Sequence, residues 1–241
     1  LWMISRMPRL WKLMYEVSDR RNMAEKPVRG IAPVERLLER LLREWKPDAV
    51  VCTYMVYPYM LDSLASCTGR AVPYLTVVTD SFVINKSWLC SKSPLWAVTD
   101  PWTRAIMEEK GLPQDRLRVT GFPVNPVLGA LAKEHPLSWK EGEPFRVLYF
   151  AQRSARHARA ELAGMLDANP ALHVTCILGR RFRRIYPRIR DLRARYGRRL
   201  TVRGWTRRVP SYLAASHVVV GKAGGATVHE VLAAARPMLV N

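Results

Sequence analysis

Short apolar runs alternate with segments of helical spacing along most of the chain, and this alternation constrains the fold more than any other feature. Strands that alternate with helices are typical of parallel sheets with helices on both faces. We therefore expect an α/β protein. The apolar runs that predict strands lie at residues 49–52, 72–78, 95–98, 117–120, 145–150, 172–178, 199–203, 217–220 and 237–240.

Helical segments separate these runs. Over residues 31–45 apolar side chains recur every three or four positions, which predicts an amphipathic helix. Asp100 and Pro101 are typical of an N-cap and a first helical turn, so a helix is expected over 101–110. Further helices are expected at residues 58–68, 157–168, 187–196, 209–215 and 225–235.

A proline-rich connector divides the pattern. Pro123 and Pro126 disfavour both helix and sheet ladders, and a polar stretch follows them. The alternating runs on either side predict two Rossmann-like domains, over 1–121 and 144–241, joined by an interdomain linker over 122–143. The chain starts at a leucine and stops directly after an apolar run, so we expect both domains to be incomplete.

Composition excludes several classes of protein. With 49% hydrophobic residues in 241, the chain has enough apolar material for a core, which argues against disorder. A membrane-spanning helix needs about 20 apolar residues, and no run here approaches that length. The four cysteines form no CxxC pair and no histidine lies at metal-ligand spacing, so no metal site is expected. A reducing cytoplasm is the simplest compartment.

Positive charge is concentrated in one block. The formal net charge is +19, and most of the excess lies in residues 146–208, which carry 17 arginines. Such a block can bind polyanions or an anionic membrane surface. A solvated, arginine-rich helix face is the alternative interpretation. The block contains Arg180, Arg181, Arg183, Arg184, Arg188, Arg190, Arg193, Arg195, Arg198 and Arg199.

The segment over 218–232 has the strongest chemical signal. An apolar strand ends, a turn with Gly224 and Gly225 follows, and a helix begins. Glycines let a ligand approach the backbone, and the N–H groups and dipole of a helix N-terminus favour an anion. Thr227 adds a hydroxyl donor in the first turn, and Lys222 adds positive charge just before the turn. This pattern suits a diphosphate.

Glu230 lies one helical turn beyond Thr227, where its carboxylate can accept hydrogen bonds from a sugar diol. A diphosphate at the turn with a ribose beside it describes a nucleotide diphosphate. The alternative is a glycine turn followed by a Thr-x-x-Glu capping box. The preceding apolar strand favours the ligand interpretation, because a doubly wound sheet places such a turn directly after a strand.

Several segments, in this order, resemble the family of monogalactosyldiacylglycerol synthases and processive diacylglycerol glucosyltransferases. More distantly, the chain is similar to the peptidoglycan N-acetylglucosaminyltransferase. The last 40 residues carry the most specific match. The matching segments are 47–53, 77–80, 111–113, 119–124, 204–206 and 214–230, the last including Gly221, Lys222, Ala223, Gly224, Gly225, Ala226, Thr227 and Glu230.

The resemblance implies an α/β fold of the GT-B type, with two Rossmann-like domains whose parallel sheets face a cleft. It implies an inverting, metal-independent hexosyltransferase that uses a UDP-sugar and a lipid acceptor such as diacylglycerol, with no cofactor. By resemblance, Glu230 matches the carboxylate that holds the ribose hydroxyls. The turn of Gly224, Gly225, Ala226 and Thr227 matches the diphosphate site, with Lys222 beside it. Gly204 and Trp205 match the loop that reads the uracil edge, although Trp205 can also be a core residue.

The chain also departs from the family pattern. The Gly/His-rich loop that carries the proposed catalytic base is absent, and its place would lie before Leu1, so this fragment itself is expected to be inactive. Asp80, at a strand end, is a candidate for the base. The turn over 151–157 has no glycine, although Arg153 and Ser154 can still contact phosphate. A non-catalytic relative therefore remains an alternative.

The arginine block and the lipid acceptor together predict a cytoplasmic protein that is peripheral at the inner face of the membrane. A basic module for nucleic acid or another polyanion, using residues 180–208, remains a further alternative. No RNA-recognition signature, helix-turn-helix or zinc finger supports it, so nucleic acid is not the expected partner. The expected partners are a UDP-sugar, a lipid acceptor and an anionic membrane surface.

Overall fold

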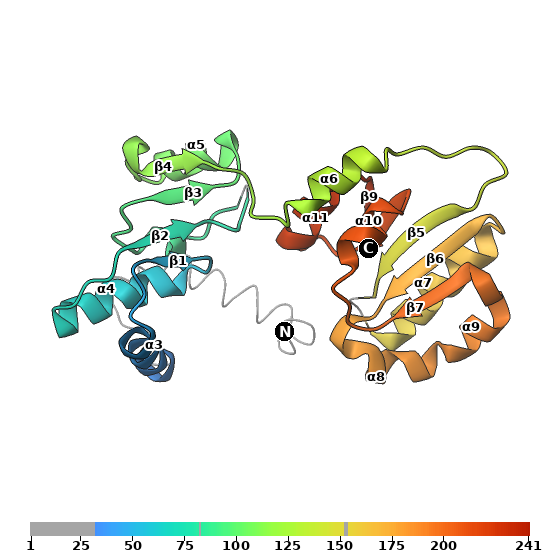
Figure 1. Ribbon diagram of the computed structural model, residues 1–241, viewed down its shortest axis with the longest axis horizontal. Helices are drawn as coiled ribbons and strands as arrows, with labels where there is room; N and C mark the ends of the chain where they lie inside the picture. The colour runs from blue at the N-terminus through green and yellow to red at the C-terminus, as the bar shows by residue number, and fades with distance from the viewer. Residues whose placement is uncertain (1–31, 82, 152–153) are drawn as a thin grey trace. The chain divides into compact units, whose positions relative to one another are not determined.

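The computed structural model describes residues 32–81, 83–151 and 154–241 (Figure 1). The chain divides into two compact units at Phe122 and Pro123. Each unit contains one sheet in which every pair of neighbouring strands is parallel. The expected α/β class with two parallel sheets is therefore confirmed.

The first unit contains a four-stranded sheet in the order β1-β2-β3-β4. Strand β3 is buried along its whole length, and Trp96 at its start packs with Met107 and Leu117 in the core of this unit. Among the described residues of this unit, the strands are β1 (Val50–Cys52), β2 (Tyr74–Val77), β3 (Trp96–Val98) and β4 (Leu117–Val119), and the helices are α3 (Ala32–Trp45), α4 (Val56–Thr68) and α5 (Pro101–Glu109).

Asp100 caps helix α5, as expected. Its side chain accepts a hydrogen bond of 2.7 Å from the backbone N–H of Thr103 and others from the hydroxyls of Thr99 and Thr103. Burial raises the pKa of Asp100, but these hydrogen bonds to the ionised form outweigh it, and the pKa is lowered overall. The helix therefore begins at the residue that the sequence indicates.

The second unit contains a five-stranded sheet in the order β7-β6-β5-β8-β9. Its first strand along the chain is thus central, and the order reverses between β5 and β8. This is the doubly wound arrangement. The strands are β5 (Phe145–Phe150), β6 (Leu172–Ile177), β7 (Leu200–Arg203), β8 (Val218–Gly221) and β9 (Met238–Val240).

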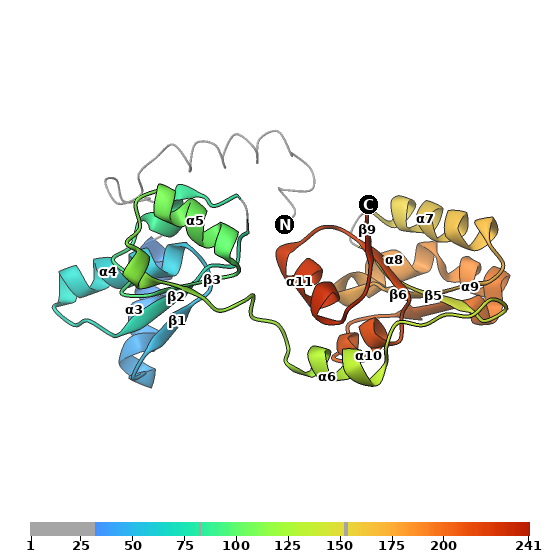
Figure 2. The ribbon, with the colours of Figure 1, turned by 90° about the horizontal axis from the view of Figure 1, so that it is seen from above.

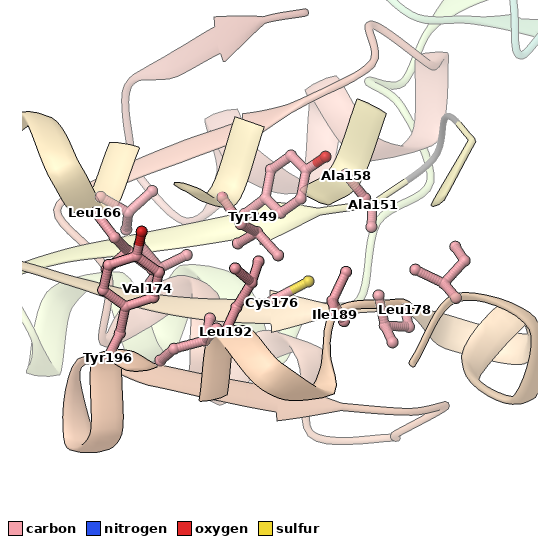
Figure 3. Packing of buried hydrophobic residues seen from close by; sticks show 14 residues of the cluster. Tyr149, Ala151, Ala158, Leu166, Val174, Cys176, Leu178, Ile189, Leu192 and Tyr196 are labelled. Atoms are coloured by element: carbon pink, nitrogen blue, oxygen red, sulfur yellow. The ribbon is translucent and has the colours of Figure 1, made fainter. Parts of the chain in front are cut away.

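Helices cover both faces of this sheet (Figure 2). On one face, residues such as Leu166, Ile189 and Leu192 pack in one cluster with Tyr149 and Cys176 (Figure 3). On the other face, Leu128, Leu213 and Val231 pack on Leu148 and Val219. The first face carries α7 (Ala155–Ala168), α8 (Phe182–Ile185) and α9 (Arg190–Tyr196); the second carries α6 (Val127–Glu134), α10 (Val209–Ala214) and α11 (Gly225–Ala233).

Two segments differ from the expected pattern. The proposed linker contains helix α6, which packs on α10 through the buried Leu128. The helix expected over 187–196 begins later, at Arg190, because Pro187 lies in a short 3-10 turn between α8 and α9. A proline lacks the backbone N–H that a continuous helix needs at that position.

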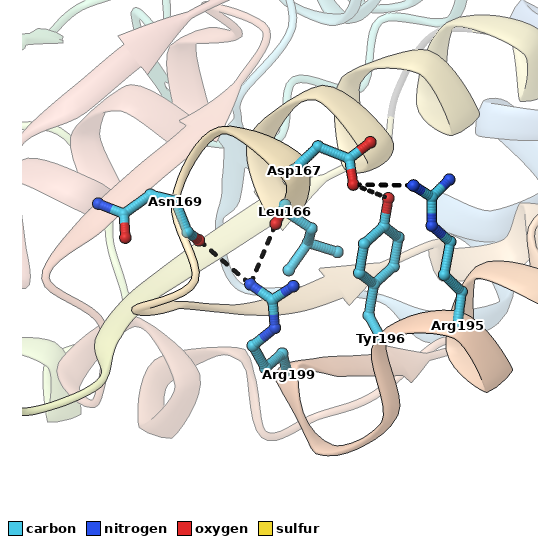
Figure 4. A network of polar contacts seen from close by, with 6 residues as sticks. All are labelled: Leu166, Asp167, Asn169, Arg195, Tyr196 and Arg199. Carbon is cyan, nitrogen blue, oxygen red and sulfur yellow. Dashed lines mark hydrogen bonds and ion pairs between the residues drawn. The ribbon is translucent and has the colours of Figure 1, made fainter.

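Part of the arginine block stabilises the second unit. Asp167, near the end of α7, accepts hydrogen bonds from Arg195 at 3.1 Å and from the hydroxyl of Tyr196 at 2.8 Å (Figure 4). Arg199 donates to the carbonyl oxygens of Leu166 and Asn169, which end the same helix. These contacts join α7 to the segment before β7. Within the described residues, no helix is both long enough and apolar enough to cross a membrane.

Candidate functional site

The reversal of strand order between β5 and β8 marks the place where a doubly wound sheet binds ligands, outside the carboxyl ends of its strands. Two helix N-termini follow the strands at this point. Helix α7 is capped by its own Ser154, whose hydroxyl accepts from the N–H of His157 and lies 2.7 Å from Nδ1 of that ring. Helix α11 begins after β8, and among the described residues no side chain caps it. Its first-turn N–H groups therefore remain available to a ligand.

The capping-box alternative for Thr227 and Glu230 is wrong. A capping box would require Thr227 to precede the helix, but α11 begins at Gly225 and its N-cap is Gly224. Thr227 therefore lies inside the first turn, half-buried, and the exposed Lys222 precedes the turn. The N–H of Gly224 donates to the carbonyl of Lys222 at 2.8 Å, which turns the chain sharply between strand and helix.

The fold itself does not require glycine at position 224. Gly224 has a φ of −93° and a ψ of 139°, which any residue can adopt. A Cβ there would meet only Oγ1 of Thr227, at 3.9 Å, which is an ordinary contact. Gly221 is different, because a Cβ at that position would lie 3.3 Å from Cβ of Phe150. The space beside Gly224 is therefore available to a ligand.

Glu230 is half-buried on α11, one turn beyond Thr227. Burial raises the pKa of its carboxyl. Among the described residues, no hydrogen bond or ion pair to the side chain of Glu230 is found, whereas its neighbour His229 contacts the carbonyl oxygen of Gly225 at 2.8 Å. A partly desolvated carboxylate without a partner is destabilised, and a ligand with hydroxyl groups would relieve that cost.

The Gly204–Trp205 loop follows β7 and so lies at the same, carboxyl edge of the sheet. Trp205 is 60% exposed, and the guanidinium of Arg207 lies 5.8 Å from the centre of its ring. The interpretation of Trp205 as a core residue is therefore wrong. Gly204 lies against Phe182 of α8, since a Cβ at Gly204 would be 3.4 Å from that ring. Sequence reasoning missed Phe182, because only the fold brings it to this loop.

The remaining candidates lie elsewhere or outside the described residues. Asp80 belongs to the first unit, where it follows β2, is half-buried and accepts a 2.8 Å hydrogen bond from Nε1 of Trp88. Arg153 falls outside the described residues. Ser154 is engaged as a cap, a role that its spacing before α7 would have indicated. In the described part of the chain, no cluster of three or more histidine, cysteine or acidic residues is arranged to hold a metal.

Solved structures share this architecture. A Listeria monocytogenes structure assigned as a UDP-N-acetylglucosamine 2-epimerase matches with a TM-score of 0.56 and 12% identity, covering 87% of this chain and 61% of that one. The UDP-GlcNAc 2-epimerase of Neisseria meningitidis, bound to UDP-GlcNAc, matches with a TM-score of 0.53 and 13% identity, over 86% and 62%. At this identity the likeness concerns the fold, which is of the GT-B type.

Sequence comparison then gives the family. The profile of monogalactosyldiacylglycerol (MGDG) synthase matches residues 2–124, and the chain belongs to that family. A processive diacylglycerol beta-glucosyltransferase of Staphylococcus carnosus (strain TM300) is 25% identical over 211 residues, which cover 86% of this chain and 52% of the relative. The chain thus spans about half the length of the curated relatives that it matches.

Proposed function

We propose that the protein to which this chain belongs transfers a hexose from a UDP-sugar to a lipid hydroxyl, such as that of diacylglycerol. The observation that carries the proposal concerns the reversal point of the sheet: within the described residues, the α11 N-terminus has no side-chain cap and the Glu230 carboxylate has no hydrogen-bonding partner. Family membership and the diacylglycerol glucosyltransferase relatives support the acceptor class. The epimerase bound to UDP-GlcNAc supports the donor class.

In this proposal each part of the nucleotide has a binding group in the second unit. The diphosphate binds the N–H groups of Gly225, Ala226 and Thr227, with Lys222 adding positive charge. The ribose hydroxyls donate to Glu230. The uracil binds the backbone at Gly204 and stacks near the exposed ring of Trp205. An aromatic ring already contacted by an arginine suits the stacking of a base.

The transfer itself is a single displacement. The acceptor oxygen attacks the anomeric carbon, the bond from that carbon to the diphosphate oxygen breaks, and UDP leaves with the electron pair. A general base takes the acceptor proton, and we propose either Asp80 or a residue outside this chain for that role. One displacement inverts the anomeric centre. The helix N-terminus, which carries about half an elementary positive charge, stabilises the departing diphosphate without a metal.

The arginine block supports peripheral association with an anionic membrane surface at the cytoplasmic face. Seven of its arginines are exposed and, within the described residues, have no hydrogen bond or ion pair through their side chains. Guanidinium groups that are not used by the protein are free to contact lipid phosphates. These are Arg180, Arg183, Arg184, Arg188, Arg190, Arg193 and Arg198.

Titration calorimetry with UDP tests the donor site. Glu230→Gln keeps the shape of the side chain but removes the charged acceptor. We expect UDP affinity to fall by about tenfold to a hundredfold, the usual effect of losing a hydrogen bond to a charged group. Glu141→Gln, at an exposed position far along the chain, is the matched control and should bind UDP like the wild type. Equal UDP affinity in the two variants would overturn the assignment of Glu230.

Vesicle sedimentation tests the membrane surface. Changing Arg183, Arg184 and Arg190 to serine should weaken binding to phosphatidylglycerol vesicles and leave the negligible binding to phosphatidylcholine unchanged. The charge-matched control changes Arg70, Lys110 and Arg116 of the first unit to serine. An equal loss in both triple variants would show that only net charge matters. Tight RNA binding with a steep salt dependence and no UDP affinity would instead favour a nucleic-acid-binding module.

A further inference from the structure

A polar cavity lies at the amino-terminal edge of the sheet in the second unit, opposite the carboxyl edge that carries the proposed nucleotide site. It has a volume of about 300 Å³ and lies over the starts of β5, β6 and β7, beside α10. Its lining includes Arg146, His173 and Arg198, with the hydroxyl groups of Thr175, Thr201 and Tyr212. Among the described residues that line it there is no carboxylate.

The strands beneath this cavity have an unusual pattern for a doubly wound sheet. On the α7 face, the paired residues Val147, Val174 and Leu200 are all buried. On the α10 face, the next row begins with the buried Leu148 but continues with Thr175 and Thr201, which are only half-buried. A strand that is covered on both faces is normally apolar on both. The polar row therefore marks a surface that the helices of this unit do not cover.

Of the polar side chains that line this cavity, four half-buried ones and the exposed Arg198 are not used by the described part of the protein. In the described part of the chain, the side chains of His173, Thr175, Thr201, Tyr212 and Arg198 have no hydrogen-bonding partner. Half-buried polar groups without partners cost free energy unless water or a ligand satisfies them. Their convergence on one cavity indicates a ligand that accepts several hydrogen bonds.

Arg146 is held in place at the rim. Its Nε donates to the carbonyl of Ala215 at 2.6 Å, and one terminal nitrogen lies 2.8 Å from Nε2 of His217. His217 is buried, and burial together with the positive charges of Arg146 and Arg236 lowers its pKa. The backbone N–H of Arg146 donates to Nδ1 of the same ring at 3.0 Å, so the imidazole is fixed against Arg146 and its neutral form adds no charge beside the cavity.

We infer that this cavity is a second anion site, specific for a phosphate group and separate from the proposed nucleotide site. Two guanidinium groups, an imidazole and three hydroxyl groups supply donors to the several oxygens of one phosphate. The phosphate belongs either to a small metabolite or to the headgroup of an anionic phospholipid. Because the strands are parallel, this edge and the edge that carries Glu230 are opposite ends of the same sheet. Both sites can therefore be filled together.

Titration of the wild-type chain with inorganic phosphate, at constant ionic strength in chloride, tests the site. We expect Arg198→Ala to weaken phosphate binding about tenfold or more, and the Thr175→Val, Thr201→Val pair to weaken it comparably. Arg116→Ala, which removes the same charge from the first unit, should leave it unchanged. Far-UV circular dichroism verifies that each variant is folded. No phosphate binding above that of chloride, or an equal loss in Arg116→Ala, would overturn the inference.

Two further measurements separate the sources and the sites. If the ligand is a lipid headgroup, the Thr175→Val, Thr201→Val pair loses binding to phosphatidylglycerol vesicles; if it is a small metabolite, the pair loses binding to phosphate alone. Both results support the site. Saturating UDP should leave phosphate binding intact, and displacement of phosphate by UDP would overturn the inference, because the anion would then occupy the α11 turn. Intact UDP binding with no phosphate binding would refute this site and leave the proposed function standing.

Discussion

The hydroxyl of Tyr149 donates a 2.5 Å hydrogen bond to Oε2 of Glu161, and Asn241 donates its side-chain amide to the same oxygen at 2.7 Å. Tyr149 lies on the central strand β5 and is fully buried, Glu161 lies on α7, and Asn241 follows β9. One carboxylate therefore joins the centre of the sheet, a covering helix and the end of the outermost strand.

Removing the Tyr149 hydroxyl should destabilise the second unit. Tyr149→Phe keeps the ring in the core and deletes one hydrogen bond to a carboxylate, so we expect the free energy of unfolding to fall by about 1–2 kcal/mol. Urea unfolding followed by circular dichroism measures it. Tyr186→Phe is the control, because Tyr186 stacks on Phe182 at 4.7 Å and no hydrogen bond of its hydroxyl is found in the described structure. An equal change in both variants would contradict the prediction.

Gly221 and Gly224 should respond differently to alanine. Gly224→Ala adds a methyl group without a clash but places alanine at the N-cap, so the free energy of unfolding should change by less than about 1 kcal/mol, while UDP affinity falls. Gly221→Ala forces a Cβ to within 3.3 Å of Phe150 and should cost about 1–3 kcal/mol. Thermal unfolding and UDP titration of both variants provide the comparison. Unchanged UDP affinity in Gly224→Ala would argue against a ligand at the turn.

Glu230 should reduce the stability of the chain at neutral pH. Because burial raises its pKa in the folded state, the folded state holds this proton more tightly than the unfolded state does. The ionised carboxylate therefore costs stability above the raised pKa, and the cost disappears as the pH falls below the unfolded value near 4.5. We expect Glu230→Gln to be more stable than the wild type at pH 7 and equally stable below pH 4.

Urea midpoints measured between pH 4 and pH 8 check this prediction. Glu141→Gln, at an exposed position, should follow the wild type at every pH. A Glu230→Gln variant less stable than the wild type at pH 7 would show that the carboxylate has a stabilising partner and that the site is built differently. A gain in stability together with a loss of UDP affinity is the pattern expected of a binding residue.

Asp100→Ala should destabilise the first unit by about 1 kcal/mol, the usual cost of losing an N-cap. The pKa of Asp100 is lowered, so its contribution is fully present above the unfolded value of 3.8 and is lost as the pH falls through the lower, folded value. Asp100→Asn retains the cap and should remain close to the wild type at pH 7. Acid titration of unfolding, compared among the three proteins, gives the test.

Local signals predicted much of the fold from the sequence. Asp100 was identifiable because an N-cap acts on amides two or three residues away, and the turn at Gly224 because strand, glycines and helix are contiguous. The start of helix α6 is also marked by residues that are close together in the sequence. Asn125 accepts from the N–H of Val127 at 3.1 Å, and Pro126 directly precedes the first residue of the helix. Pro126 by itself favours a connector, but in the structure it lies directly before helix α6.

Other features depend on contacts between distant parts of the chain. Arg146 and His217 are 71 residues apart, and only the pairing of β5 with β8 brings them together. The exposure of Trp205 depends on where the loop after β7 lies, which no residue pattern around it reveals. The cavity at the amino-terminal edge likewise requires three strands to be in register. Thr175 and Thr201 lie side by side only in the folded sheet, so the sequence alone does not indicate this cavity.

The central position of β5 has a consequence for synthesis on the ribosome. Strand β6 follows β5 closely in the chain and can pair with it early, but the other edge of β5 waits for β8, whose Val218 pairs with Val147. Until then the nascent unit presents an unpaired edge of an apolar strand. Such edges are templates for association between chains. We therefore expect the yield of folded protein to depend on how quickly translation proceeds from residue 150 to residue 221.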